Sequence, residues 1–137
     1  MNKHPYLRAY LAGVGIPTVF LLVVMTGYTI VRYVYNLPVP IERVIVFPMA
    51  FVPNLWGLWN LLYVAFLASR RFSIGFFGAL LPLVLAPLGY FASLALEFPI
   101  PHQIFHVVPV ALPVAMTLYY LVWKYFVAFL NAELGLV

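Results

Sequence analysis

Four long apolar runs, at about residues 9–31, 48–69, 74–96 and 109–130, constrain the fold of this chain more than any other feature. Each has roughly the 20 residues that cross about 30 Å of hydrocarbon as an α-helix. Of the 137 residues, 66% are hydrophobic and 7% are charged, whereas about a quarter of the residues in soluble domains are charged. The sequence therefore predicts an all-α, multi-pass membrane protein, folded as one transmembrane domain with a four-helix bundle.

The first run has a rival interpretation, because Lys3, His4 and Arg8 resemble the charged start of a signal peptide. The apolar stretch behind them is too long for a signal peptide, and no A-x-A-like cleavage site follows it. We therefore expect a membrane helix. The runs are continuously apolar rather than alternating, which favours helices over a β-barrel.

Basic residues near the ends of the runs predict the orientation. Five lie on one side of the expected membrane, and two lie on the other: Lys3, Arg8, Arg70, Arg71 and Lys124 against Arg32 and Arg43. Because positive charge accumulates in cytoplasmic segments, both termini are expected in the cytoplasm and the two Pro-rich loops outside.

A phrase recurs in the two Pro-rich loops, as LPVPIERVIVFPMA at residues 37–50 and FPIPHQIFHVVPVA at residues 98–111. Matching residues stand at a constant offset of 61: Pro38, Pro40, Pro48 and Ala50 against Pro99, Pro101, Pro109 and Ala111. A duplication would make two parallel-repeat hairpins, about residues 9–69 and 74–131, with pseudo-two-fold symmetry along the membrane normal. The alternative is chance recurrence in a biased composition.

The same phrase predicts where long helices deform. A helix over residues 41–69 would be about 43 Å long, more than the hydrocarbon thickness. Pro48 and Pro109 are the expected kinks or breaks, since proline removes a helical hydrogen bond. Whether residues 41–47 and 102–108 continue the helices or lie at the interface is left open. Further prolines are expected to kink the spans themselves: Pro17, Pro53, Pro82, Pro87 and Pro113.

The second run carries polar and aromatic residues too deep for the aromatic belt at the headgroups. Trp56, Asn60 and Tyr63 share one face of the expected helix, with Trp59 at its edge and Asn54 on another face. At matching depth the fourth run has Thr117, Tyr119 and Tyr120. Together these residues predict an aromatic, uncharged pocket for a ligand, although Asn and Thr also bridge helices as plain packing.

A polar cluster is expected on the outer side, formed by Arg32, Glu42, Arg43, Glu97, His102 and His106. His102 and His106 are four residues apart, so a helix would place both imidazoles on one face, and Glu97 is a third candidate metal ligand. The spacing is common and the repeated half has Ile41 and Ile45 instead. We therefore expect no metal there, and hydrogen bonds or ion pairs in its place.

No catalytic motif stands out, and no acidic residue lies near the middle of a run, which disfavours proton-coupled export. The sequence thus predicts a small non-catalytic membrane protein without a cofactor, which binds or passes an uncharged lipophilic small molecule. The alternatives are an accessory subunit of a larger membrane complex and, more remotely, a metal-dependent enzyme. Expected partners are membrane lipids and the lipophilic molecule, with a homodimer or larger complex left open and no nucleic acid.

Overall fold

The computed structural model describes residues 3–98 and 100–136, and every regular element in these ranges is helical. Pro99 of the repeated phrase lies outside the described residues. Within the described ranges, four helices are long and apolar enough to cross a membrane: Pro5–Tyr33, Ile41–Arg70, Ile74–Ala95 and Ile104–Glu133. The prediction of an all-helical chain with four helices able to span a membrane is confirmed, which is consistent with a multi-pass membrane protein.

The four membrane helices divide into shorter elements. The first is α1 (Pro5–Tyr33) alone. The second contains α2 (Ile41–Val44), the π-helical η1 (Ile45–Ala50), α3 (Phe51–Leu62), η2 (Tyr63–Leu67) and η3 (Ala68–Arg70); the third contains α4 (Ile74–Ala79) and α5 (Leu81–Ala95); the fourth contains α6 (Ile104–Val122), η4 (Trp123–Val127) and α7 (Ala128–Glu133).

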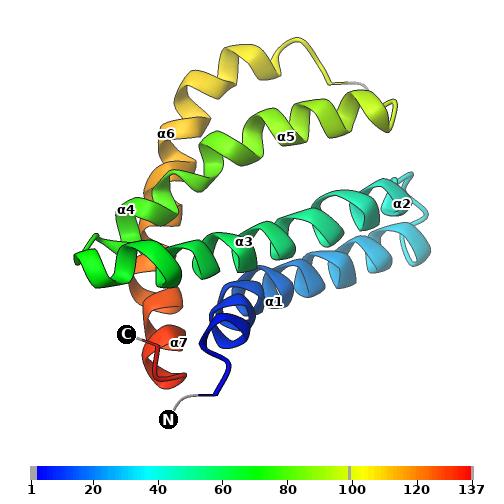
Figure 1. Ribbon diagram of the computed structural model, residues 1–137. Coiled ribbons are helices and arrows are strands. Elements are labelled where there is room, and N and C mark those ends of the chain that lie inside the picture. The colour runs from blue at the N-terminus through cyan, green and yellow to red at the C-terminus, as the bar shows by residue number, and fades with distance from the viewer. Residues whose placement is uncertain (1–2, 99, 137) are drawn as a thin grey trace.

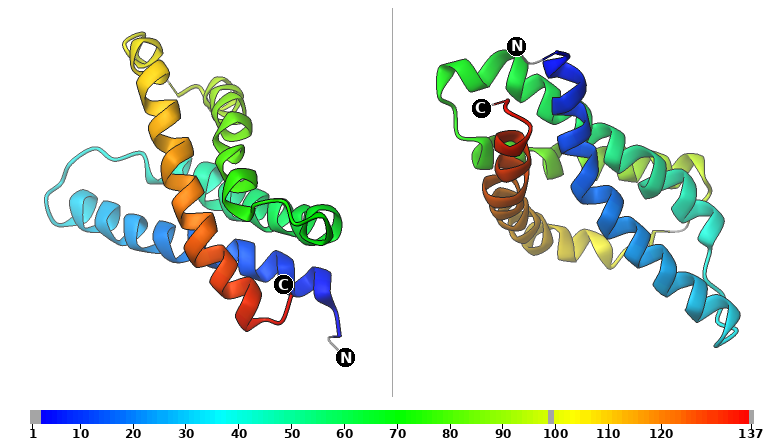
Figure 2. Two further views of the ribbon diagram at one scale, coloured as in Figure 1. Left: turned by 90° about the vertical axis from the view of Figure 1, so that its left-hand side faces the viewer. Right: turned by 90° about the horizontal axis from the view of Figure 1, so that it is seen from below.

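The helices form two antiparallel pairs, α1 with α3 and α4–α5 with α6 (Figure 1). The pairs meet at the end of the molecule where both termini lie and diverge toward the loops between α1 and α2 and between α5 and α6. The turned views show the same divergence (Figure 2). Interior packing is therefore concentrated at the end that holds both termini, which we call the closed end.

Glycine allows α1 and α3 to approach closely. A Cβ atom on Gly13 would lie 2.5 Å from the carbonyl oxygen of Trp56 and 2.8 Å from the Cα of Gly57. No side chain fits there unless the helices separate. The adjacent Ala9 and Ala12 are also buried, so a strip of small residues joins the first pair.

A second close approach joins α4 to the fourth helix. A Cβ on Gly78 would overlap the Trp123 side chain, and one on Gly75 would meet the ring of Tyr120 at 2.8 Å. Trp123 is fully buried in a cluster with Trp56, Leu81 and Val127. This cluster is the core at the closed end.

Proline acts differently in the two halves. The second membrane helix is interrupted just before Pro48, where Phe47 is extended (φ −128°, ψ 132°), as the preference of residues preceding proline predicts. The kink or break expected at Pro109 is not a break: α6 begins at Ile104 and continues through Pro109 and Pro113. A helix can accept proline at the loss of one hydrogen bond. Residues 104–108 therefore belong to α6 and extend it toward the loop that follows α5.

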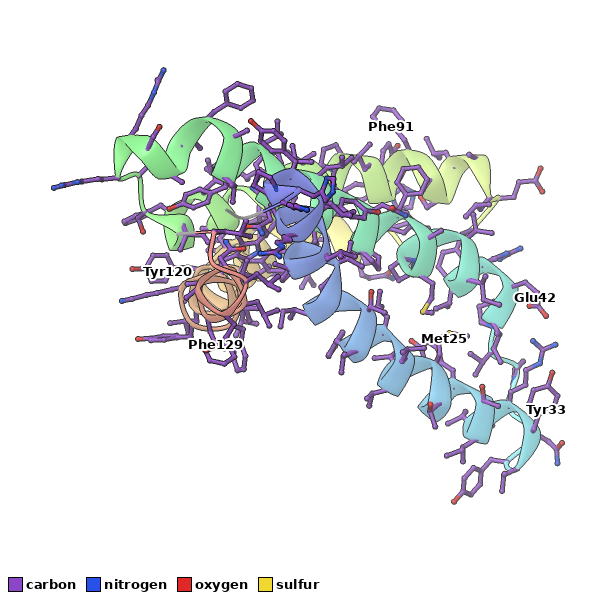
Figure 3. The ribbon with its side chains drawn as sticks, turned by 60° about the horizontal axis from the view of Figure 1, so that its bottom comes forward. Met25, Tyr33, Glu42, Phe91, Tyr120 and Phe129 are labelled. Atoms are coloured by element: carbon purple, nitrogen blue, oxygen red, sulfur yellow. The ribbon has the colours of Figure 1, made fainter. Side chains whose placement is uncertain are left out.

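Most of the apolar surface faces outward. Phe91 and Phe129 project away from neighbouring helices (Figure 3) and are 64% and 60% exposed. Such surface is expected to contact lipid chains, which solvate it as well as a protein interior would.

Candidate functional site

Asn60 lies at the closed end and is fully buried. Its Nδ2 donates to the Ala9 carbonyl and to Oδ1 of Asn131, both at 2.7 Å, and its Oδ1 accepts from Nδ2 of Asn131 at 2.9 Å. The amide pair therefore connects α1, α3 and α7. Because both amide hydrogens of Asn60 are used, this residue connects helices and leaves no donor for a ligand.

Asn131 is equally buried and was missed by the sequence reasoning. It follows the fourth predicted run by one residue. The available signal was periodicity: Asn131 is four residues after Val127 and eight after Trp123, so all three share a helix face.

Two other aromatic residues of the second helix form packing contacts. The indole of Trp59 donates to the Phe77 carbonyl at 2.8 Å and stacks on the Phe77 ring, with the centroids 4.7 Å apart. The hydroxyl of Tyr63 donates to the Phe72 carbonyl at 2.8 Å. These bonds fix the turn between the second and third membrane helices.

Three predicted site residues lie away from Trp56. Asn54 is exposed; it accepts a hydrogen bond from the Tyr10 hydroxyl and donates to the Ala50 carbonyl at 2.7 Å. Thr117 is exposed and donates to Pro113, one turn back in its own helix. Tyr120 packs edge-on against Phe76 of α4. The structure thus does not unite the eight predicted residues in one pocket.

Trp56 and Tyr119 do come together, with ring centroids 5.0 Å apart. They line a partly open cavity of about 410 Å³ between α1, the η1–α3 segment and α6. The remaining lining is apolar and comprises Ile16, Pro17, Phe20, Leu21, Pro48, Val52, Leu118 and Val122. This Trp56 cavity has no charged residue in its lining.

Trp56, a lining residue of this cavity, carries an unsatisfied donor. Trp56 is 5% exposed, and its Nε1 is buried without a hydrogen-bond partner. An unpaired buried donor costs about 1–3 kcal/mol. An acceptor that entered the cavity and reached this N–H would remove that cost.

Trp123 has the same unpaired Nε1, and its side chain is fully buried. Its ring packs against Trp56 with the centroids 5.4 Å apart and sits over Gly78. Trp123 is absent from the lining of the Trp56 cavity. Of the two orphaned indoles, Trp56 is thus the one beside open space.

The outer polar cluster is only partly assembled. Arg32 and Glu42 form a salt bridge at 2.8 Å, while the Arg43 guanidinium lies over the Phe98 ring, 5.5 Å from its centroid. His102 and His106 are exposed. Within the described ranges, no three His, Asp or Glu side chains approach closely enough to hold a metal ion, so Glu97, His102 and His106 are not brought together as a ligand set.

Comparisons with protein-family models, with curated proteins and with solved structures find no match to this chain. The case for function therefore depends on the Trp56 cavity and its chemistry.

Proposed function

We propose that the protein binds an uncharged lipophilic small molecule in the Trp56 cavity, without catalysis. The observation that carries this proposal is the apolar cavity itself, whose lining includes Trp56, a residue with a buried and unpartnered Nε1. A volume of about 410 Å³ lies within the range of about 300–1,000 Å³ typical of small-molecule sites.

The lining defines the ligand class. A charged ligand would lose its hydration without gaining a counter-charge, because no residue around the cavity is charged. A ligand with one carbonyl or ether oxygen would accept the Trp56 hydrogen bond and bury its apolar remainder against α1 and α6. Within this ligand class, the N–H would select molecules that carry an acceptor.

The cavity revises the set of proposed contact residues. Trp56 and Tyr119 remain from the residues expected at first. Four of the apolar lining residues come from α1, which the sequence pattern had not implicated: Ile16, Pro17, Phe20 and Leu21. Trp59, Asn60 and Tyr63 do not line the cavity, and their polar groups form hydrogen bonds elsewhere.

Benzophenone tests this function directly, because it is an uncharged lipophilic ketone that crosslinks to nearby C–H groups under ultraviolet light. The full-length protein in detergent should be labelled at the cavity-lining residues of α1 and α6. In Trp56→Phe, labelling there should fall about two- to tenfold, the equivalent of one net hydrogen bond. Trp59→Phe is the matched control, since that indole bonds to Phe77 outside the cavity.

Equal labelling of the outward faces and of the cavity would contradict the proposal, as would unchanged labelling in Trp56→Phe. Peptide mass spectrometry distinguishes these outcomes because the lining comes from well-separated segments of the chain.

The accessory-subunit alternative is favoured by one observation: in the fourth membrane helix, Ile104–Glu133, none of the most apolar stretch is buried within the chain. A partner subunit would cover that face. The protein would then require the partner to remain folded, whereas the proposed binding protein is stable as a single chain in detergent.

Two finer features accompany the proposal. The constant offset of 61 residues between the Pro-rich phrases supports a fused duplication of helical hairpins. The excess of Lys and Arg at the end that holds both termini supports a cytoplasmic location for the termini.

A further inference from the structure

A second cavity lies between the two helix pairs near their outer ends. It measures about 260 Å³ and is lined by η1 and the end of α2 on one side and by α5 and the following loop on the other. Its lining consists of Arg43, Val44, Phe47, Pro48, Gly89, Ala92, Ser93, Leu96, Phe98 and Ile100. We refer to this space as the Arg43 crevice.

Arg43 is the charged residue of this lining. It interacts with the Glu42 carboxylate at longer range, and it forms no salt bridge within the described residues. The salt bridge found within residues 3–98 and 100–136 joins Arg32 to Glu42, so the nearest carboxylate in sequence is already paired. The Arg43 guanidinium instead lies over the Phe98 ring. A cation on an aromatic face keeps most of its hydrogen-bond donors free for an anion.

The rest of the crevice offers little besides apolar contact. Ser93, the hydroxyl residue in the lining, donates to the Tyr90 carbonyl at 2.6 Å within its own helix. Phe47, in the extended break before Pro48, lies against Gly89 of α5. One cationic end and an otherwise apolar crevice together form an amphipathic site.

The lining of the crevice runs along α5, from the end of that helix toward its middle. Arg43 lies near the start of the second membrane helix, and Leu96 directly follows the end of α5, so both are expected at headgroup depth. From Leu96 to Gly89 the lining runs seven residues along α5, which is about 10 Å toward the hydrocarbon at 1.5 Å per residue. A molecule seated here would have its head at the interface and its tail inside.

We propose that the Arg43 crevice is a binding site for an anionic phospholipid. The phosphate group binds the Arg43 guanidinium as a charge-assisted contact, and one acyl chain occupies the crevice between η1 and α5. The occupant differs from the ligand of the Trp56 cavity, which has no charged wall. Pro48 lines both spaces, so they are neighbours with opposite preferences for charge.

The test titrates the full-length protein in mild detergent with dioleoyl phosphatidylglycerol or dioleoyl phosphatidylcholine and counts bound lipids by native mass spectrometry. The wild type is expected to bind phosphatidylglycerol about fivefold more tightly than phosphatidylcholine, because one basic residue near the membrane surface has an effect of this size. In Arg43→Gln the two lipids should bind about equally. Arg71→Gln, at the opposite end, is the matched control and should keep the preference for phosphatidylglycerol.

Two further measurements separate the contribution of the lipid headgroup to binding from that of the acyl chain. Ala92→Phe fills the crevice and retains Arg43, so it should lose one bound phosphatidylglycerol. Free glycerol 3-phosphate, which has the same phosphate and no chain, should not displace the lipid. Circular dichroism checks that each variant keeps its helix content.

The proposal is overturned by a fivefold preference that survives in Arg43→Gln, by an equal loss in Arg71→Gln, by unchanged binding in Ala92→Phe, or by displacement with free glycerol 3-phosphate. Benzophenone labelling of the Trp56 cavity should be unaffected by Arg43→Gln, so failure of this site and failure of the proposed function are distinguishable.

Discussion

Asn60 and Asn131, 71 positions apart, exchange two side-chain hydrogen bonds of 2.7 and 2.9 Å in a fully buried pair. A third bond, from Asn60 to the Ala9 carbonyl, adds the first helix to the junction. Buried amides in a membrane protein need internal partners, because lipid offers none. This relationship joins the two helix pairs at the end where both termini lie, and the pairs diverge beyond it (Figure 1).

Removal of one amide of this pair should destabilise the junction. Asn131→Leu keeps the number and branching of the side-chain heavy atoms but leaves Oδ1 of Asn60 without its partner, so the free energy of unfolding should fall by about 1–2 kcal/mol. Denaturant titration in detergent, followed by circular dichroism, measures the change.

Thr117→Val is the matched control, because Thr117 is exposed and bonds within its own helix. It should change stability by less than about 0.5 kcal/mol. Equal stability of Asn131→Leu and wild type would show that the amide pair does not hold the helix pairs together.

A methyl group at the α1–α3 crossing should separate these helices. Gly13→Ala places its Cβ 2.5 Å from the Trp56 carbonyl oxygen, and such overpacking costs about 1–3 kcal/mol. Gly27→Ala, in the same helix with nothing within 4 Å of the new Cβ, should be neutral or stabilising by up to about 1 kcal/mol. Thermal unfolding of the two variants side by side gives the comparison.

Equal unfolding temperatures for Gly13→Ala and Gly27→Ala would contradict the close approach of α1 and α3 at Gly13. If Gly13→Ala alone is destabilised, it should also alter the Trp56 cavity, since Trp56 supplies both the carbonyl at the crossing and the indole in the wall.

The sequence predicted the four membrane helices well because apolar length is a local property. It also singled out Trp56 and Asn60 as too polar for lipid, and both are buried. Their partners were harder to identify: Asn60 pairs with Asn131 across the chain, and no local pattern specifies which of several deep polar residues will meet. Asn54 has the same side chain as Asn60, yet it is exposed and bonds to Tyr10.

The effect of a proline on a helix is also hard to predict from the sequence alone. Pro48 and Pro109 occupy matching places in the repeated phrase, yet the helix is interrupted before the first and continues through the second. Proline removes one hydrogen bond in either case; whether the chain then extends depends on the packing around it. Phe47 at the break packs against Gly89 of another helix, a contact that sequence reasoning did not foresee.

The proposed orientation predicts opposite labelling of two loops. The chain has no cysteine, so Leu37→Cys and Ser73→Cys each introduce a single reactive site. A membrane-impermeant maleimide should label Leu37→Cys in intact cells and Ser73→Cys only after permeabilisation. The reverse pattern would place both termini outside.

The most direct test of the central claim is the intact mass of the protein purified in mild detergent, measured by native mass spectrometry. The account predicts a stoichiometric, uncharged, non-lipid adduct on the wild type and on Trp59→Phe that is lost or strongly reduced in Trp56→Phe. An adduct that persists undiminished in Trp56→Phe, or a wild-type protein without any adduct, would contradict binding at the Trp56 cavity.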